Sequence, residues 1–554
     1  MFETLETKEA VLARSEALVA SIVRDCELSG SKYTDPEFVA GDESIGVYSK
    51  TESSGELKPP LPKGIVWLRP KHVKSWTPAH RKLDWTVYRD PWPFQVNQGG
   101  VGDCWLISAM KTIVRRRELL EQIFPRNDAA AEKGIYQVRL CVDGKWKVCI
   151  VDDLIPCDVD GKEAFTFAYE KQLFNILLEK AFAKLNGSYA GIYGGLPLTA
   201  YETMTGAFAR RVWFDENDDV WEQLTNAKRE RFFVTASTPA TSPEERERYH
   251  AAGLRANHCY SVTDVTIQHG HRLVQLHNTA KNIDWKGKWS EWPSWSPLVR
   301  KMCTMLELWQ VGVFWIEMDD LLKWFASIDI CEYRSNYHEV RVEQPVLTKN
   351  ELNRAKVLMF TVDAACEVAV EARAKVREYL VEFVVNIHRA TREHRLGDLV
   401  VTALADEIHG HDYAEPIQWV IRSSRPVTVG STSIYRFMKC ESIHAMIQKE
   451  GVVETVQDDV TVRSWRTDHT MMVWVENRST RKYAHVNVSV SPRHPEYYED
   501  RKSSVAPMSR RIVYQLQADR MMRGVELSFE ISTSSTFFFR TRAFCQVFAE
   551  LPIV

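Results

Sequence analysis

One glycine-rich segment constrains the fold of this chain more than any other, because it leads into a cysteine that opens a helix. The segment reads Gln98-Gly-Gly-Val-Gly-Asp-Cys104-Trp105. We expect a helix that begins at residues 103–104 and runs to Arg117. Glycines before a helix allow the backbone to turn tightly into it. The dipole and free N–H groups of a helix N-terminus stabilise a thiolate, so Cys104 is a candidate nucleophile.

A nucleophilic cysteine needs a general base and a third group that orients the base. His258 opens a run of alternating apolar and polar residues, and Asn278 ends the next such run. This alternation is typical of half-buried strands, so two adjacent strands would place His258 beside Asn278. Gln98 precedes Cys104 on the same loop, and its side-chain N–H would complete an oxyanion hole with the Cys104 backbone N–H. The order Cys, His, Asn with wide spacing is typical of papain-like proteases.

These residues stand in motifs that resemble those of the calpain family of intracellular cysteine proteases. The family carries Q-G-x-x-G-D-C-W, G-H-x-Y-S-V and R-N-P-W-G-x-x-x-W-x-G-x-W. The similarity covers residues 30–335 in the family's order. The corresponding segments are Gln98–Trp105, Asn257–Val262 and His277–Glu291, with further matches at Lys32–Phe38, Trp67–Lys71, Val151–Asp153 and Leu178–Tyr189.

The resemblance implies the roles of four residues and a two-lobed papain-like core. Cys104 is then the nucleophile, His258 the base, Asn278 the group that orients the base, and Gln98 an oxyanion donor. The cysteine would lie on a helical lobe, and the histidine and asparagine on a β-rich lobe. Cys259, next to the base, is interpreted as a buried strand residue.

Taken together, the patterns predict an α+β fold with four regions. Residues 1–30 are typical of an acidic amphipathic helix, because apolar positions recur among Glu and Ala. Residues 31–208 and 209–338 would be the first and second protease lobes. Residues 345–554 show period-two alternation and predict antiparallel β-sandwich structure, either one large sandwich or two in tandem with a boundary near residue 450.

Local signals predict several elements within these regions. Tyr136–Val142 and Lys145–Val151 flank Asp-Gly, a strong hairpin signal. Leu173–Leu185 has helical periodicity and ends at Asn-Gly. Met471–Val475 and Tyr483–Val490 flank a polar turn and predict a second hairpin.

The chain departs from the family directly after Asn278. The family has Pro-Trp-Gly there, and this chain has Thr279-Ala280-Lys281. The family's tryptophan covers the hydrogen bond between asparagine and histidine. Ala280 therefore predicts a bond that is open to water and an imidazole that is held less firmly.

The calcium-binding positions of the family are also altered. In the family, calcium bound to both lobes draws the catalytic residues together, and Ca²⁺ requires six to eight oxygen ligands. Asp284 and Glu291 are retained as candidate calcium ligands. The sequence therefore predicts a calcium dependence that is weak or lost. The positions at which the family's acidic ligands are absent are Gln95, Ala190, Val311 and Val313.

Composition narrows the choice of partners and compartment. Lys+Arg number 71 and Asp+Glu number 74, so no basic surplus favours nucleic acid. No run of 18 apolar residues predicts a transmembrane helix, and neither a signal peptide nor an N-terminal myristoylation motif is recognised. The 11 cysteines include no CxxC pair, as expected for reduced thiols in the cytoplasm.

The sequence thus predicts a cysteine endopeptidase that makes limited cuts in protein substrates, with cytoskeletal proteins suggested by the resemblance alone. We find no EF-hand loops of the D-x-D-x-D-G type, which would make this an atypical member of the family. The alternative is a calpain-like pseudoenzyme that binds peptides or partner proteins through the same cleft.

Overall fold

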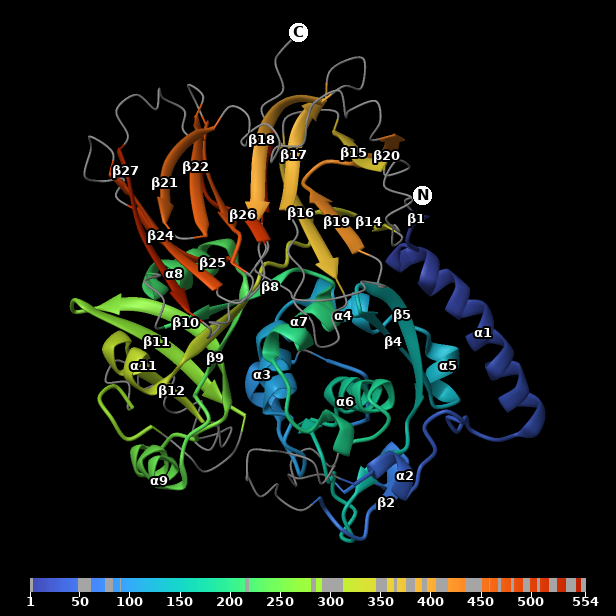
Figure 1. The fold of residues 1–554 in the computed structure, drawn as a ribbon. Coiled ribbons are helices and arrows are strands. Elements are labelled where there is room, and N and C mark those ends of the chain that lie inside the picture. Colours follow the sequence, from blue (N-terminus) through green and yellow to red (C-terminus); the bar gives the residue numbers. More distant parts are fainter. Residues whose placement is uncertain are drawn as a thin grey trace. The chain divides into compact units, whose positions relative to one another are not determined.

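The protein consists of two compact units, one formed by Glu6–Ser335 and the other by Met1–Leu5 together with Asn336–Val554. Figure 1 shows our computed structural model of the chain. Within the part that it describes, no helix is long and apolar enough to cross a membrane. The described residues are 3–47, 61–74, 83–89, 91–168, 170–214, 219–279, 285–290, 312–344, 356–362, 366–374, 384–390, 396–404, 417–433, 451–457, 459–466, 470–479, 483–491, 499–505, 509–517, 526–534 and 545–549.

The first part of the Glu6–Ser335 unit is mainly helical and surrounds one apolar core. The helix α6, Phe174–Leu185, supplies the centre of this core, and its residues up to Ala183 are buried. It packs on the paired strands β4, Ile135–Val142, and β5, Lys145–Asp152 (Figure 1). The helix is therefore buried on every side, and its polar residues Asn175, Glu179 and Lys180 are buried with the apolar ones.

The first hairpin and the α6 helix confirm the local predictions. Asp143 and Gly144, which join β4 to β5, both have positive φ, as a two-residue hairpin turn of this kind requires. Beyond the last residue of α6, Gly187 has a φ of 83°. Glycine takes this left-handed conformation at little cost, so it ends the helix.

The helix that follows the glycine-rich segment is shorter than predicted. The helix α3, Cys104–Ile113, stops early, and a separate helix α4, Arg117–Ile123, follows it. Arg116 between them has a ψ of 85°, which is not helical. The helix expected within residues 1–30 is present as α1, Lys8–Ser29. The other elements of this lobe are α2 (Asp42–Ile45), α5 (Asp128–Glu132), α7 (Pro197–Thr205), β2 (Val66–Leu68), β3 (Val96–Asn97), β6 (Ile155–Cys157) and β7 (Phe167–Ala168).

The second part of the Glu6–Ser335 unit is built on a six-stranded antiparallel sheet. Its strands are β8 (Ala209–Trp213), β9 (Phe233–Ser237), β10 (Cys259–Gln268), β11 (His271–Asn278), β12 (Val313–Glu317) and β13 (Ser327–Cys331). They lie in the order β12-β11-β10-β9-β13-β8. Their apolar side chains form a second core cluster with the helices of this lobe. These helices are α8 (Val220–Glu230), α9 (Pro243–Ala252) and α11 (Met318–Trp324).

A buried ion pair links two strands of this sheet. Arg211 on β8 faces Asp329 on β13 in the strand register, and its guanidinium donates to both carboxylate oxygens at 2.7 and 2.8 Å. The side chain of Asp329 is fully buried, and this burial raises its pKa above the ordinary value even beside the guanidinium. The pair satisfies a carboxylate that water cannot reach.

The described residues of the second unit form antiparallel sheets. A five-stranded sheet has the order β1-β14-β19-β16-β28, and four- and three-stranded sheets have the orders β21-β22-β23-β26 and β25-β24-β27. Two further pairs are β15-β20 and β17-β18. The strands are β1 (Glu3–Thr4), β14 (His338–Gln344), β15 (Lys356–Val362), β16 (Cys366–Ala374), β17 (Val384–Ala390), β18 (Leu396–Leu404), β19 (Ile417–Ser423), β20 (Val427–Ser433), β21 (Val452–Gln457), β22 (Val460–Arg466), β23 (Thr470–Asn477), β24 (Tyr483–Ser491), β25 (Glu499–Val505), β26 (Ser509–Gln517), β27 (Glu526–Ser534) and β28 (Cys545–Ala549).

The predicted hairpin of Met471–Val475 with Tyr483–Val490 is wrong, although both segments are strands. β23 pairs with β22 and β26, whereas β24 pairs with β25 and β27, so the polar turn connects two different sheets. Period-two alternation shows that a strand has one buried face, but it does not show which strand is the neighbour.

We expect Arg211→Ala to lower the free energy of unfolding by about 3–5 kcal/mol, because it leaves the carboxylate of Asp329 buried without its partner. Thermal and chemical denaturation of the purified chain would measure this loss. The matched control is Arg126→Ala, which breaks an exposed pair with Asp128 and should leave the free energy of unfolding nearly unchanged. Equal losses in the two variants would contradict the assignment.

Candidate active site

Cys104 is the first residue of α3 and follows the glycine-rich loop. Its side chain is partly exposed, and Asp103 stands before it as the N-cap residue. The sequence attributes the glycines to a tight turn, but neither Gly99 nor Gly102 has a positive φ. A Cβ on Gly99 would lie 2.0 Å from the carbonyl oxygen of Phe165. Glycine is therefore required because the loop packs directly against neighbouring backbone.

His258 and Asn278 are brought together by the pairing of β10 with β11. His258 directly precedes β10, and Tyr260 is in register with Asn278. The Nε2 atom of His258 lies 2.9 Å from Oδ1 of Asn278. Because an amide oxygen only accepts, Nε2 carries the proton, and Nδ1 is the ring nitrogen left for the thiol. Both side chains are buried, with exposed fractions of 6% and 1%.

The backbone at His258 is held from both sides. Asn257 has a φ of 49°, in the left-handed region that asparagine tolerates better than most residues other than glycine. Asparagine can therefore stand where the calpain motif has glycine. Thr238 accepts the His258 N–H at its Oγ1 and donates its own N–H to the His258 carbonyl, both at 3.0 Å.

The Cys104 thiol interacts with His258 and with Cys259. The thiol of Cys259 donates a hydrogen bond to the Cys104 sulfur, and this is the largest influence on the pKa of Cys104. Burial raises that pKa, whereas the charge and the hydrogen bond of His258 lower it further. The net effect is a pKa well below the ordinary thiol value, which favours the nucleophilic thiolate.

Thr279 connects the oxyanion-hole candidate to the base. Its hydroxyl donates to Oε1 of Gln98 at 2.8 Å and lies 3.1 Å from Nε2 of His258, while its carbonyl accepts the Gln98 backbone N–H at 3.3 Å. These contacts fix the orientation of the Gln98 amide, whose Nε2 donates one N–H to the Val101 carbonyl at 3.0 Å. Ala280 lies outside the described residues. Even so, Thr279 is only 2% exposed, so the bond predicted to be open to water is buried.

α3 is tied to the six-stranded sheet just behind the site. Ser261 on β10 donates its hydroxyl to the carbonyl of Ser108 on α3 at 2.7 Å. One turn further along α3, the Lys111 ammonium donates to the Pro93 carbonyl and lies 3.0 Å from Nε2 of His277. All of these side chains are buried, so the contacts fix the helix that carries the thiol against the strand that follows the imidazole.

Two carboxyl groups are buried next to the start of α3. Burial raises the pKa of Asp103 to about 7, and it raises the pKa of Glu179 well above its ordinary value with a further contribution from Asp103. Glu179 accepts the Thr166 backbone N–H with both oxygens, at 3.1 and 3.2 Å. Near neutral pH the pair therefore carries less negative charge than two carboxylates, which limits repulsion of the nearby thiolate.

In the first lobe, the residues at the positions of the family's acidic calcium ligands do not fit a calcium site. Gln95 is buried, and its Oε1 already accepts the Trp92 backbone N–H at 2.7 Å and the Gln172 amide at 3.2 Å. Ala190 supplies no side-chain oxygen. Within the described ranges, no group of three or more His, Cys, Asp or Glu side chains is placed to hold a metal ion.

The second-lobe calcium candidates fall largely in segments that the structure leaves undescribed. Val313 opens β12 and supplies no side-chain oxygen. The candidate ligands Asp284 and Glu291 lie outside the described residues, and so does Val311, the other position where the family's acidic residue is replaced.

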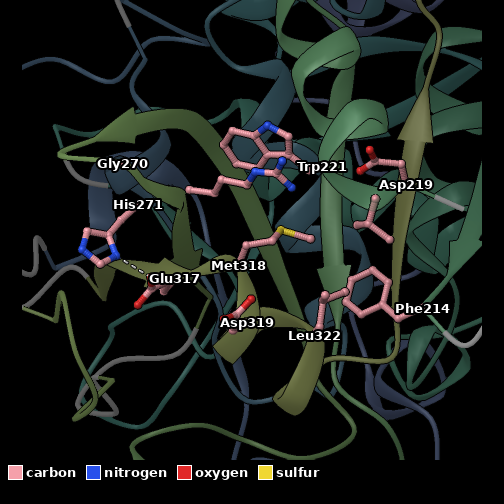
Figure 2. A pocket seen from close by; sticks show the side chains of 11 residues that line it. Phe214, Asp219, Trp221, Gly270, His271, Glu317, Met318, Asp319 and Leu322 are labelled. Atoms are coloured by element: carbon pink, nitrogen blue, oxygen red, sulfur yellow. Dashed lines mark hydrogen bonds and ion pairs between the residues drawn. The ribbon is translucent and has the colours of Figure 1, made fainter.

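A separate pocket of about 440 Å³ lies on the second lobe (Figure 2). Trp221, Met318 and Leu322 form apolar parts of its lining, and His271 hydrogen-bonds to Glu317 at its edge. None of the predicted catalytic residues lines it. The arrangement around the thiol is therefore the candidate active site, and this pocket is not.

The sequence did not reveal that Thr279 orients Gln98 or that Cys259 lowers the pKa of Cys104. Both stand directly beside a predicted catalytic residue in the chain. Cys259 is buried, as interpreted, and its hydrogen bonding with Cys104 raises its own pKa and lowers that of the nucleophile. Only strand pairing and the packing of α3 show these contacts, because the partners are far apart in sequence.

A thiol at a helix N-terminus, an imidazole and an asparagine amide on that imidazole form the arrangement of papain-like cysteine peptidases. Residues 33–332 match the model of the family described as calpain family cysteine protease. The chain belongs to the calpain family of cysteine proteases.

Curated relatives agree with this assignment. The chain is 30% identical over 341 residues to the calpain-type cysteine protease DEK1 of Arabidopsis thaliana, covering 59% of this chain and 15% of that protein. It is 29% identical to the calpain-2 catalytic subunit of Gallus gallus, covering 56% and 44%. It is 29% identical to the calpain-1 catalytic subunit of Rattus norvegicus, covering 58% and 46%. The match therefore spans less than half of the length of each of these relatives.

We expect Cys104 to react with iodoacetamide at a rate that stays high below about pH 8.5, the ordinary pKa of a thiol. Its thiolate, and hence its reactivity, is lost only as the pH falls through its lowered pKa. Alkylation rates measured against pH by peptide mass spectrometry would show this. Cys259→Ala removes a hydrogen-bond donor and should move the midpoint to higher pH. Cys149, whose pKa burial raises to about 12, is the internal control and should not react.

Proposed function

We propose that this chain is a cysteine endopeptidase that makes limited cuts in protein substrates. The observation that carries this proposal is the hydrogen bond between His258 and Asn278 beside a thiol of lowered pKa. A lowered thiol pKa and an imidazole oriented by an amide support acyl transfer, because that chemistry uses a thiolate and a positioned base. A cysteine kept only for packing needs neither a base nor a group that orients the base.

The proposed chemistry uses side chains of this chain alone. The Cys104 thiolate attacks the carbonyl carbon of a peptide bond, and negative charge develops on the carbonyl oxygen. The Cys104 backbone N–H, at the first turn of α3, and an N–H of the Gln98 amide stabilise that charge. His258 then protonates the leaving amine, and water attack on the thioester regenerates the thiolate. Asn278 holds the imidazole in the tautomer that this sequence of steps needs.

We further propose that calcium dependence is weak or lost. The buried amide of Gln95 and the side chains of Ala190 and Val313 support this, because they supply no carboxylate where the family has acidic ligands. Contacts within the protein, such as Ser261 on Ser108, already join the two lobes. Proteolysis then needs no step through a metal.

For the second unit we propose β-sandwich structure. The four- and three-stranded sheets formed by β21 to β27 support this, since consecutive strands β23 and β24 belong to different sheets, as in two packed layers. The proposed boundary near residue 450 falls between β20 and β21. β28 pairs with β16 and so returns the chain to the five-stranded sheet.

A vinyl sulfone or epoxide probe tests the peptidase proposal. We expect labelling at Cys104 and cleavage of a fluorescent protein substrate under reducing conditions, with similar rates in calcium and in chelator. Cys104→Ala and His258→Ala should abolish both, whereas His269→Ala, at an exposed histidine, should change neither. Absence of labelling and cleavage with or without calcium would contradict the proposal and favour a peptide-binding pseudoenzyme. A steep rise with calcium, with calorimetric binding at both lobes, would overturn the calcium proposal alone.

We expect Thr279→Val to lower kcat/KM by about 5- to 150-fold, because it removes the donor to Gln98 and leaves a buried amide oxygen unpaired, at about 1–3 kcal/mol. Steady-state kinetics on one peptide substrate would measure this, and the loss should fall on kcat. Thr279→Ser keeps the hydroxyl and should recover most of the rate. If serine and valine are equally impaired, packing rather than the hydroxyl is what Thr279 supplies.

A further inference from the structure

A lysine is buried behind the candidate active site, in the last turn of α3. Lys111 is 1% exposed and is one of the largest fully buried side chains among the described residues. It lies seven positions after Cys104, which is about two helical turns, so the two side chains share one face of the helix. A buried ammonium costs free energy unless acceptors surround it, so Lys111 must be held by its neighbours.

The Lys111 ammonium joins two segments that are far apart in the chain. It donates to the carbonyl of Pro93, in the short 3-10 helix η3, Pro93–Gln95, at 3.0 Å. It also lies 3.0 Å from Nε2 of His277 on β11, and His277 is itself 1% exposed. A charged ammonium has only donors, so the Nε2 atom of His277 accepts, and the ring is neutral with its proton on Nδ1.

Each of the three joined segments carries one group of the site. The η3 segment runs through β3 into Gln98. α3 begins with Cys104, and β11 ends at Asn278, directly after His277. Because consecutive residues of a strand move together, a displacement of His277 displaces Asn278 as well. Lys111 is therefore bonded to both segments that approach the thiol, from the helix on which the thiol stands.

The same segments are tied again where they reach the site. The Gln98 backbone N–H donates to the Thr279 carbonyl at 3.3 Å, and the Thr279 hydroxyl donates to the Gln98 side chain at 2.8 Å. On the sheet, His277 is in register with Ser261, whose hydroxyl donates to the carbonyl of Ser108 on α3. The ammonium contacts thus complete a closed set of bonds that runs from α3 to β11, to the loop of Gln98 and back.

The lysine–histidine pair is built on a departure from the calpain motifs. The family motif R-N-P-W-G has arginine where this chain has His277. A guanidinium has only donors, so an arginine here would not accept from Lys111 and would place a second positive charge beside it. A neutral histidine supplies an acceptor, which fits it to this lysine.

We propose that Lys111 is a positioning residue that acts through Pro93 and His277 to hold the three parts of the site in register. It does not touch the reacting atoms. Without its ammonium, the Gln98 loop and the end of β11 are free to shift against α3, and a displacement of about 1 Å can lower a rate by about 100-fold. The effect on catalysis rests on the proposed function, whereas the effect on the Cys104 thiolate does not.

The first test is steady-state kinetics on one peptide substrate with Lys111→Met, which keeps the length of the side chain and removes its charge. We expect kcat to fall about 10- to 100-fold with KM nearly unchanged, because the defect lies in the reacting geometry rather than in substrate binding. His277→Leu should give a similar loss. His277→Gln, whose amide oxygen accepts from Lys111, should recover most of the rate. Lys147→Met, at an exposed lysine of β5, is the matched control and should change nothing.

A merely structural role makes a different prediction for the double variant. Lys111→Met combined with His277→Leu removes both polar groups, so the free energy of unfolding should recover relative to the single variants. The tie between the segments is still absent, so kcat should stay low. Recovery of kcat together with stability would overturn the positioning role, and so would an undiminished kcat in Lys111→Met.

A second measurement separates this inference from the peptidase proposal. Alkylation of Cys104 by iodoacetamide at pH 7 depends on the imidazole beside the thiol but needs no substrate. We expect its rate to fall about 10-fold in Lys111→Met and to be unchanged in Lys147→Met, because an imidazole that has moved away stabilises the thiolate less. This slowing in a chain that cleaves nothing would reject the peptidase proposal and retain the positioning role. Cleavage with equal kcat and equal alkylation in Lys111→Met would do the reverse.

Discussion

The packing of α3 against β10 is the contact on which the candidate site depends. Cys104 and Ser108 are one helical turn apart, so they share a face of α3, and Ser108 meets Ser261 on the sheet. Rotating the helix by one residue would turn that face through about 100° and separate the thiol from the imidazole. The buried hydrogen bond between the two serines opposes this rotation, because breaking it leaves polar groups unsatisfied without water.

The electrostatics of the site follow from the same packing. Burial alone raises the pKa of a thiol, as Cys149 shows with a value of about 12. Cys104 behaves in the opposite way because Cys259 donates to its sulfur and His258 adds charge and a second hydrogen bond. The raised pKa values of Asp103 and Glu179 reduce the negative charge nearby. A thiolate is therefore stabilised by neighbours that only the folded chain supplies.

Two of the described positions where this chain differs from the calpain motifs are occupied by residues with definite contacts. Thr279 stands where the family motif has proline, and its hydroxyl links Gln98 to His258. Gln95 stands at a calcium-ligand position, and its oxygen is already engaged by two protein donors. Side-chain hydrogen bonds such as that from Ser261 to Ser108 also join the two lobes, and together with these occupied positions they support the proposal that calcium dependence is weak or lost.

Much of the local structure was predictable from the sequence, because the signals are local. Two-residue Asp-Gly turns need positive φ, so the β4–β5 hairpin follows from Asp143 and Gly144. Helical periodicity likewise defines α6. The hairpin predicted from β23 and β24 was wrong because alternation leaves the neighbouring strand undetermined. The motif glycines were found correctly, but their reason was not, since Gly99 is required by the distant backbone of Phe165.

The sequence by itself determined the family, the order of the lobes and the identity of the residues that approach one another at the site. The motifs carry that information because each role in the site requires a particular residue type at a particular position in the chain. Only the tertiary structure decided that Thr279 orients Gln98, that the bond between His258 and Asn278 is buried, and that Cys259 lowers the pKa of the nucleophile. Thr279 and Gln98 are 181 positions apart, and even the 20 positions between His258 and Asn278 are bridged only by strand pairing. Side-chain identity does not specify such contacts until the strands pair and the helix packs.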